Sequence, residues 1–161
     1  MKMFTNLFAV MTLVSAATLL VSCKDAIMTT DKLPEAAQSF IKEYFPENTV
    51  SYVKKDSELT KTTYEVVFQD GTEIEFDGKG QWDKIDCKRT AVPAALIPAA
   101  IADYVRQSFP GQVIVKIDKE TLGHEIELAS GLELKFDKKG KLVNVLLDLY
   151  VCVVIFAIGG H

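Results

Sequence analysis

The sequence predicts an α+β fold in which a helix followed by about four antiparallel strands occurs twice in tandem, with the helices on one face of the sheet. Three observations predict it. Similar segments recur at a nearly fixed offset, each unit opens with apolar residues at helical spacing, and each continues with apolar and polar residues in alternation. At 161 residues, 48% hydrophobic and 25% charged, the chain is long enough to bury a core.

The internal similarity divides the body of the chain into two units. The offset between matching segments is 64 positions at first and becomes 60 after a four-residue deletion. Such regularity rarely arises by chance, so we place repeat 1 at 33–90 and repeat 2 at 91–148. The matching pairs are 33–37 with 97–101, Phe45-Pro46 with Phe109-Pro110, Asp70-Gly71 with Ser130-Gly131, Phe76-Asp77 with Phe136-Asp137, and Gly80 with Gly140.

A helix opens each unit. In the first, Pro34 suits the first helical turn, where its missing N–H would have no partner, and Pro46 ends the helix. In the second, Pro110 ends the helix, and Pro93 and Pro98 predict a short extra turn at 94–97. The apolar residues at helical spacing are Ala37, Phe40, Ile41 and Tyr44 in the first helix and Ile97, Ile101, Tyr104, Val105 and Phe109 in the second.

Strands follow each helix, recognised by apolar and polar residues in alternation. Asp70, Asp77 and Asp137 fall in the turns between them, where an aspartate side chain bonds the local backbone, and we prefer this role to calcium binding. The predicted strands are 50–54, 64–69, 73–76 and 81–87 in repeat 1, and 113–117, 125–128 and 132–136 in repeat 2.

These features resemble the PepSY-like proteins of Bacteroidetes, which are named after a likeness to beta-lactamase inhibitory protein. The resemblance covers about residues 33–145 and rests on Leu33-Pro34-Glu35-Ala36-Ala37, Tyr44-Phe45-Pro46, the segment 50–55 and the strand–glycine–strand pairs. It implies a secreted or lipid-anchored protein, and related PepSY domains are thought to restrain peptidases. The inhibitory protein grips its enzyme with aromatic residues. Here Trp82 and Tyr52 are the only candidates, and alternation turns Trp82 inward, which argues against beta-lactamase inhibition.

Glutamates alternate with the core residues of the predicted strands. Since successive side chains of a strand point to opposite faces, these glutamates should lie on the face away from the helices. A solvated face is the simpler interpretation, and a docking face for a basic partner is the alternative. The candidate protein-binding residues are Glu65, Glu73, Glu75, Glu125, Glu127 and Glu133.

The chain offers little material for catalysis, so we expect no enzyme, no metal and no cofactor. A nucleophile needs a general base, and the only histidines are His124, at the start of a predicted strand, and the terminal His161. No metal-binding motif is present. The net charge of −4 argues against a nucleic-acid partner. Cys87 and Cys152 are expected to be free, with a disulfide between them as the alternative.

The N-terminus has the organisation of a secretory signal, with Lys2 before a long apolar stretch and no acid in residues 1–22. It ends in Leu20-Val21-Ser22-Cys23, which resembles the bacterial lipobox. We therefore expect a signal peptide at 1–22, lipidation of Cys23, a tether at 23–32 and attachment to the outer membrane, facing the periplasm or the cell surface. Lys24-Asp25 resembles a surface-export signal, although Ala26 replaces the second acid.

The C-terminal tail, 149–161, does not follow the repeat. Residues 149–158 are all apolar, a run about half as long as a membrane-spanning helix needs. The run is interpreted as an extra edge strand, a short covering helix or an aberrant end, and we slightly prefer the last because the family pattern stops near Asp148.

Together these observations predict a lipid-anchored, non-enzymatic binding module of the cell envelope. Its partners would be the membrane, through the lipid, and an envelope protein. The alternative is an inhibitor or regulator of a secreted peptidase or another envelope enzyme.

Overall fold

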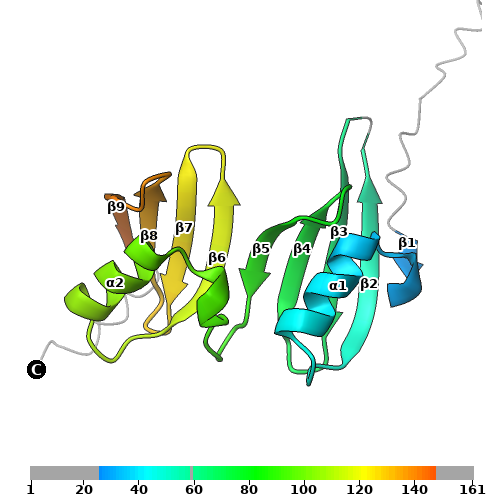
Figure 1. Ribbon diagram of the computed structural model, residues 1–161, viewed down its shortest axis with the longest axis horizontal. Helices are drawn as coiled ribbons and strands as arrows, with labels where there is room; N and C mark the ends of the chain where they lie inside the picture. The colour runs from blue at the N-terminus through cyan, green and yellow to red at the C-terminus, as the bar shows by residue number, and fades with distance from the viewer. Residues whose placement is uncertain (1–25, 59, 148–161) are drawn as a thin grey trace, which may run out of the picture.

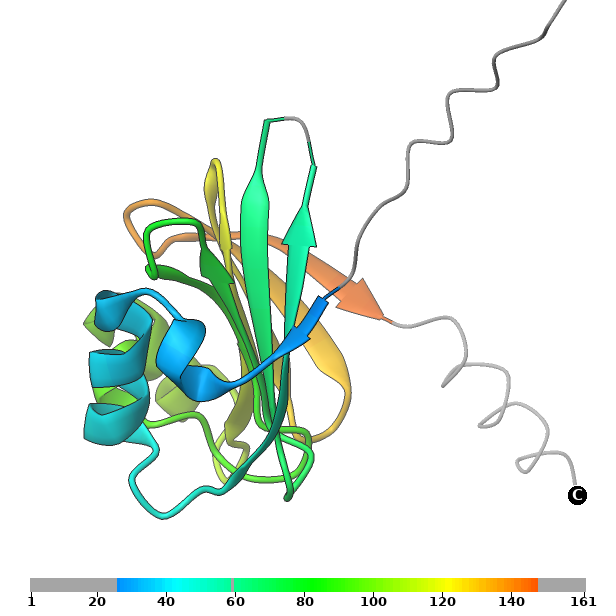
Figure 2. The same cartoon turned by 90° about the vertical axis from the view of Figure 1, so that its right-hand side faces the viewer.

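The computed structural model describes residues 26–58 and 60–147, which build one nine-stranded antiparallel sheet with helices on one face (Figure 1, Figure 2). The strand order in the sheet follows the chain from β1 to β9. The strands are β1 (Ala26–Met28), β2 (Val50–Ser57), β3 (Thr62–Phe68), β4 (Glu73–Asp77), β5 (Trp82–Asp86), β6 (Ile114–Glu120), β7 (Gly123–Leu128), β8 (Leu132–Asp137) and β9 (Leu142–Leu147).

Two short helices accompany the sheet. Helix α1 (Glu35–Tyr44) and helix α2 (Ala99–Ser108) each have ten residues and follow a proline at the N-cap. Two single 3-10 turns precede them, η1 (Thr30–Lys32) and η2 (Ala94–Leu96). Within the described residues, no helix is long and apolar enough to cross a membrane.

The predicted fold class is wrong. The sequence predicted an α+β tandem repeat of helix-plus-strand units, whereas the structure is largely β, one continuous nine-stranded sheet with only two short helices. The error has a physical cause at the junction of β5 and β6, where Lys84 pairs with Asp118, Ile85 with Ile117 and Asp86 with Lys116. This pairing joins strands that the prediction assigned to separate units. The prediction failed here because alternation within a strand carries no information about which strand lies beside it.

The core lies between the sheet and the helices. One row of directly paired apolar residues crosses all nine strands, and most of its members are fully buried. Helix α1 packs Phe40 edge-on against Phe76 of β4, with ring centroids 5.6 Å apart, and helix α2 packs Tyr104 against Phe136 of β8 at 5.4 Å. The row consists of Met28, Val53, Val66, Ile74, Ile85, Ile117, Ile126, Leu134 and Val145.

The predicted turn role of the three aspartates is confirmed. Asp70 Oδ1 accepts a hydrogen bond from the Thr72 backbone N–H at 2.9 Å. Asp77 Oδ1 accepts from two backbone N–H groups further along its turn, and Asp137 Oδ1 does the same. Each carboxylate therefore satisfies backbone donors that the tight turn leaves unpaired.

Several predictions concern residues outside the described ranges. These are the signal peptide at 1–22, lipidation of Cys23, the tail at 149–161, and the states of Cys152 and His161. The segment 23–32, predicted as a tether, contains β1, which pairs with β2 at one edge of the sheet.

Candidate functional site

The face of the sheet opposite the helices carries two adjacent rows of mostly charged side chains, and we call these two rows the outer face. Directly paired residues of antiparallel strands share a face, so the strand register assigns every member. The first row consists of Lys54, Glu65, Glu75, Lys84, Asp118, Glu125 and Lys135, and the second of Tyr52, Val67, Glu73, Asp86, Lys116, Glu127 and Glu133.

The structure brings all six predicted glutamates onto the outer face, on strands β3, β4, β7 and β8. All six are half-buried. Sequence reasoning singled out the glutamates as candidates and not the lysines and aspartates that lie between them. The signal was present, since Lys84 and Lys116 each adjoin a buried isoleucine, Ile85 and Ile117, and must therefore point away from the core.

Ion pairs tie the acids of the outer face to these lysines. Lys135 Nζ lies 2.6 Å from Glu125 Oε2 and Lys84 Nζ lies 3.5 Å from Glu75 Oε1. Lys88, which follows β5, donates to both Glu73 Oε2 at 2.9 Å and Asp86 Oδ2 at 2.7 Å. The surface is therefore a mixed pattern of both charges rather than the uniformly acidic face that the glutamates alone suggested.

The side chains in the middle of the outer face are only slightly exposed. Lys116 and Asp118 on β6 form an ion pair at 3.2 Å, and their side chains are only 19% and 18% exposed. Burial raises the pKa of the Asp118 carboxyl, although the Lys116 ammonium opposes the shift, and burial also raises the pKa of Glu127. Beside this pair lies a shallow hollow of about 510 Å³, lined by residues of β4, β5 and β6 that include Glu75 and Lys84.

Aromatic side chains contribute little to the outer face. The Trp82 ring packs towards α1, 6.4 Å from Phe40, so its inward placement is confirmed. Its other side is covered by Lys119, whose Nζ lies 3.5 Å from the ring centroid and donates to the Trp82 carbonyl. Tyr52 lies on the outer face near one end of the sheet and is 42% exposed.

The remaining reactive groups are spread apart. His124 is the second residue of β7, and its pKa is lowered by burial and by the Lys119 charge. Cys87 is a buried free thiol whose pKa is raised to about 11, first by burial and then by the charge of Asp86. Within residues 26–58 and 60–147, no group of three or more His, Cys, Asp and Glu side chains is placed to hold a metal ion.

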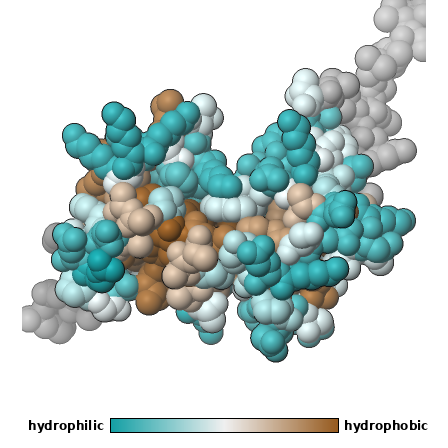
Figure 3. All heavy atoms as spheres, viewed as in Figure 1, coloured by the Kyte–Doolittle hydropathy of each residue, from teal (hydrophilic) through white to brown (hydrophobic). Residues whose placement is uncertain are grey.

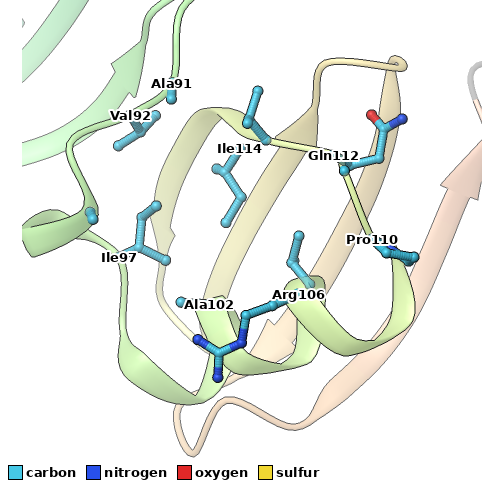
Figure 4. Close-up of a pocket in the computed structure, with 12 residues that line it drawn as sticks. Ala91, Val92, Ile97, Ala102, Arg106, Pro110, Gln112 and Ile114 are labelled. Atoms are coloured by element: carbon cyan, nitrogen blue, oxygen red, sulfur yellow. The ribbon is translucent and has the colours of Figure 1, made fainter.

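A second hollow lies on the helix face. It has a volume of about 400 Å³ and is mostly apolar, with Val92, Ile97 and Ile114 along one side and Arg106 of α2 at the other (Figure 4). Figure 3 shows hydrophobic surface gathered beside α2 on this face. Arg106 pairs with Asp103 at 2.7 Å, so the one charge at the rim is already neutralised within the helix.

Comparison with known proteins identifies relatives over most of the chain. A family model described as "Putative beta-lactamase-inhibitor-like, PepSY-like" matches residues 16–61 and 62–144. No protein with a curated description matches the chain.

Three crystal structures of Bacteroides proteins are similar to this chain, each with a TM-score of 0.74. A "putative periplasmic protein" of the DUF2874 family from Bacteroides vulgatus is 35% identical and covers 78% of this chain and 99% of its own. A second B. vulgatus protein, described as periplasmic and of unknown function, is 37% identical and covers 77% and 100%. A "putative calcium-regulated periplasmic protein" from Bacteroides thetaiotaomicron is 39% identical and covers 76% and 97%.

Proposed function

This chain belongs to the PepSY-like family, and from that premise we propose that it is a lipid-anchored, non-enzymatic protein of the cell envelope that binds a protein partner through its outer face. The observation that carries the proposal is the pair of charged rows crossing the sheet opposite the helices. A wide surface of fixed, alternating charge suits the docking of a complementary protein surface.

The envelope location is supported from two directions. Three structural neighbours at 35–39% identity are described as periplasmic proteins. The sequence adds a secretory signal that ends in a lipobox-like Leu20-Val21-Ser22-Cys23. A diacylated Cys23 would hold the protein on a membrane, because two acyl chains bind far more strongly than one.

The ion pairs of the outer face favour binding over chemistry. Glu73, Glu75 and Glu125 each have a lysine partner within 3.5 Å, so they are charge-neutralised and ordered in the way that a preformed docking surface requires.

Photo-crosslinking in intact envelopes tests the docking surface. A crosslinker at Val67, the half-buried apolar residue within the second row, should trap a partner, and the simultaneous change of Glu73, Glu75, Glu125 and Glu127 to Gln should remove the adduct. The matched control changes Glu35, Glu43 and Glu47, exposed acids in and directly after α1, to Gln and should leave the adduct unchanged. An adduct that survives the first set as well as the second would overturn the proposal.

The anchor has its own test. A clickable fatty acid should label the full chain, and the label should be absent from Cys23→Ala. Labelling of that variant to the same extent would place the lipid elsewhere.

A second candidate function, inhibition or regulation of an envelope enzyme such as a secreted peptidase, is favoured by the inhibitor-like description of the family. It is distinguished by adding the purified protein to the crosslinked partner. Inhibition predicts that the partner's enzymatic activity falls with saturation, and simple binding predicts unchanged activity.

A further inference from the structure

The edge strand β1 carries a highly exposed apolar side chain. Ile27 is 80% exposed and pairs directly with Lys54, which places it at the end of the first row of the outer face. Tyr52, on the neighbouring strand, presents a 42% exposed ring on the same face. The edge formed by β1 and β2 therefore offers an exposed aliphatic group and an exposed aromatic residue on one face.

The chain that precedes this edge is very short. Only Lys24-Asp25 separates Cys23 from Ala26, the first residue of β1. Three residue steps span at most about 11 Å even when fully extended. The headgroup layer of one leaflet is itself roughly 5–8 Å thick. A lipid on Cys23 therefore holds β1 at the membrane surface, whatever path the two intervening residues take.

From this placement we propose that the β1–β2 edge rests on the lipid bilayer, with Ile27 entering the headgroup layer and Tyr52 meeting the interface beside it. The proposal rests on the lipid anchor of the proposed function and adds the surface that the membrane contacts. An exposed isoleucine is stabilised when the interface removes it from water, and tyrosine is enriched at that depth.

The orientation determines how a partner reaches the outer face. Strands β1 and β9 lie at opposite ends of the sheet (Figure 1), so a bilayer at β1 leaves β9 farthest from the membrane. Neighbouring strands are about 4.8 Å apart, so the sheet rises roughly 40 Å from the lipid. The sheet then stands on its edge, and the charged rows open sideways towards other envelope proteins.

A fluorescent depth measurement tests the contact. The full lipidated chain, in a Cys152→Ser background with Cys87 buried, carries an environment-sensitive dye at Ile27→Cys in vesicles of phosphatidylethanolamine and phosphatidylglycerol. Leu122→Cys is the matched control, since Leu122 is 82% exposed but lies in the turn between β6 and β7. Quenching by aqueous iodide and by spin-labelled lipid is measured for each variant.

The emission of the dye at position 27 should shift to the blue, and spin-labelled lipid should quench it. Its iodide quenching constant should be at least threefold smaller than that of the dye at position 122. Equal iodide quenching at both positions, in protein that floats with the vesicles, would overturn the orientation while leaving the anchor intact. Protein that does not float with the vesicles would instead overturn the anchor, and the orientation with it.

Discussion

The close packing of α2 against the turn at Gly140 yields a quantitative prediction. Gly140, in the turn between β8 and β9, has φ +77°, and a Cβ built on it would lie 2.6 Å from the Ala100 Cβ. Gly131, in the turn between β7 and β8, has a nearly equal φ of +81° but nothing within 4 Å of its Cβ position. The pair separates the cost of a left-handed backbone from the cost of a steric clash.

The magnitudes follow from that difference. Gly131→Ala should lower the free energy of unfolding by about 1–2 kcal/mol, the cost of a left-handed alanine. Gly140→Ala adds an overlap that the helix can relieve only by shifting, which costs about 1–3 kcal/mol more. Because the clash involves a single methyl group, Ala100→Gly should recover most of the added loss in the double variant.

Urea unfolding at pH 7, followed through the fluorescence of the single tryptophan, Trp82, measures the four proteins of the cycle and Gly131→Ala. The coupling between positions 140 and 100 should be at least 1 kcal/mol. Equal losses for the two glycine variants, or a coupling energy near zero between positions 140 and 100, would refute the placement of α2 against this turn.

Three further predictions concern titration and accessibility. Burial raises the pKa of Glu127, so the folded chain binds the Glu127 proton more tightly than the unfolded chain does, and the ionised carboxylate destabilises the fold at pH 7. Glu127→Gln should therefore increase the free energy of unfolding at pH 7, and this gain should disappear below about pH 4, where Glu127 is protonated in both states. A gain that is unchanged at pH 3 would contradict this. Cys87, buried and with a pKa near 11, should react with a thiol reagent at pH 8 only on unfolding, so rapid labelling of the native chain would disprove its burial. Lys119→Met removes the ammonium group that lies 3.5 Å from the centroid of the Trp82 ring, so it should change the tryptophan emission spectrum of the native protein. An identical spectrum would contradict the contact between Lys119 and the ring.

Local features of this protein were predictable from its sequence. Pro34 and Pro46 bracket α1, and Pro98 and Pro110 bracket α2, because proline is accepted in the first turn and stops a helix beyond its end. The turn aspartates bond their own backbone, and alternation turned the six glutamates away from the core. These outcomes depend on contacts within a few residues of chain.

The outer face was predicted only in part, because its ion pairs depend on which strands lie side by side. Alternation assigns Glu75 to a face of its own strand, but not the residue that lies beside it on the next strand. The Lys84 partner of Glu75 and the two-acid site of Lys88 emerged only from the register of β4 against β5.

The sequence by itself determined the turns, the ends of the two helices and the apolar side of each predicted strand, since steric preferences and side-chain periodicity act locally. Only the tertiary structure decided that β5 and β6 join to make one sheet, that Ala26–Met28 adds a ninth strand beside the predicted anchor, and that acids and lysines interleave across the outer face. Backbone hydrogen bonds between strands are the same for any residue pair, so the choice of neighbour depends on the packing of the whole chain.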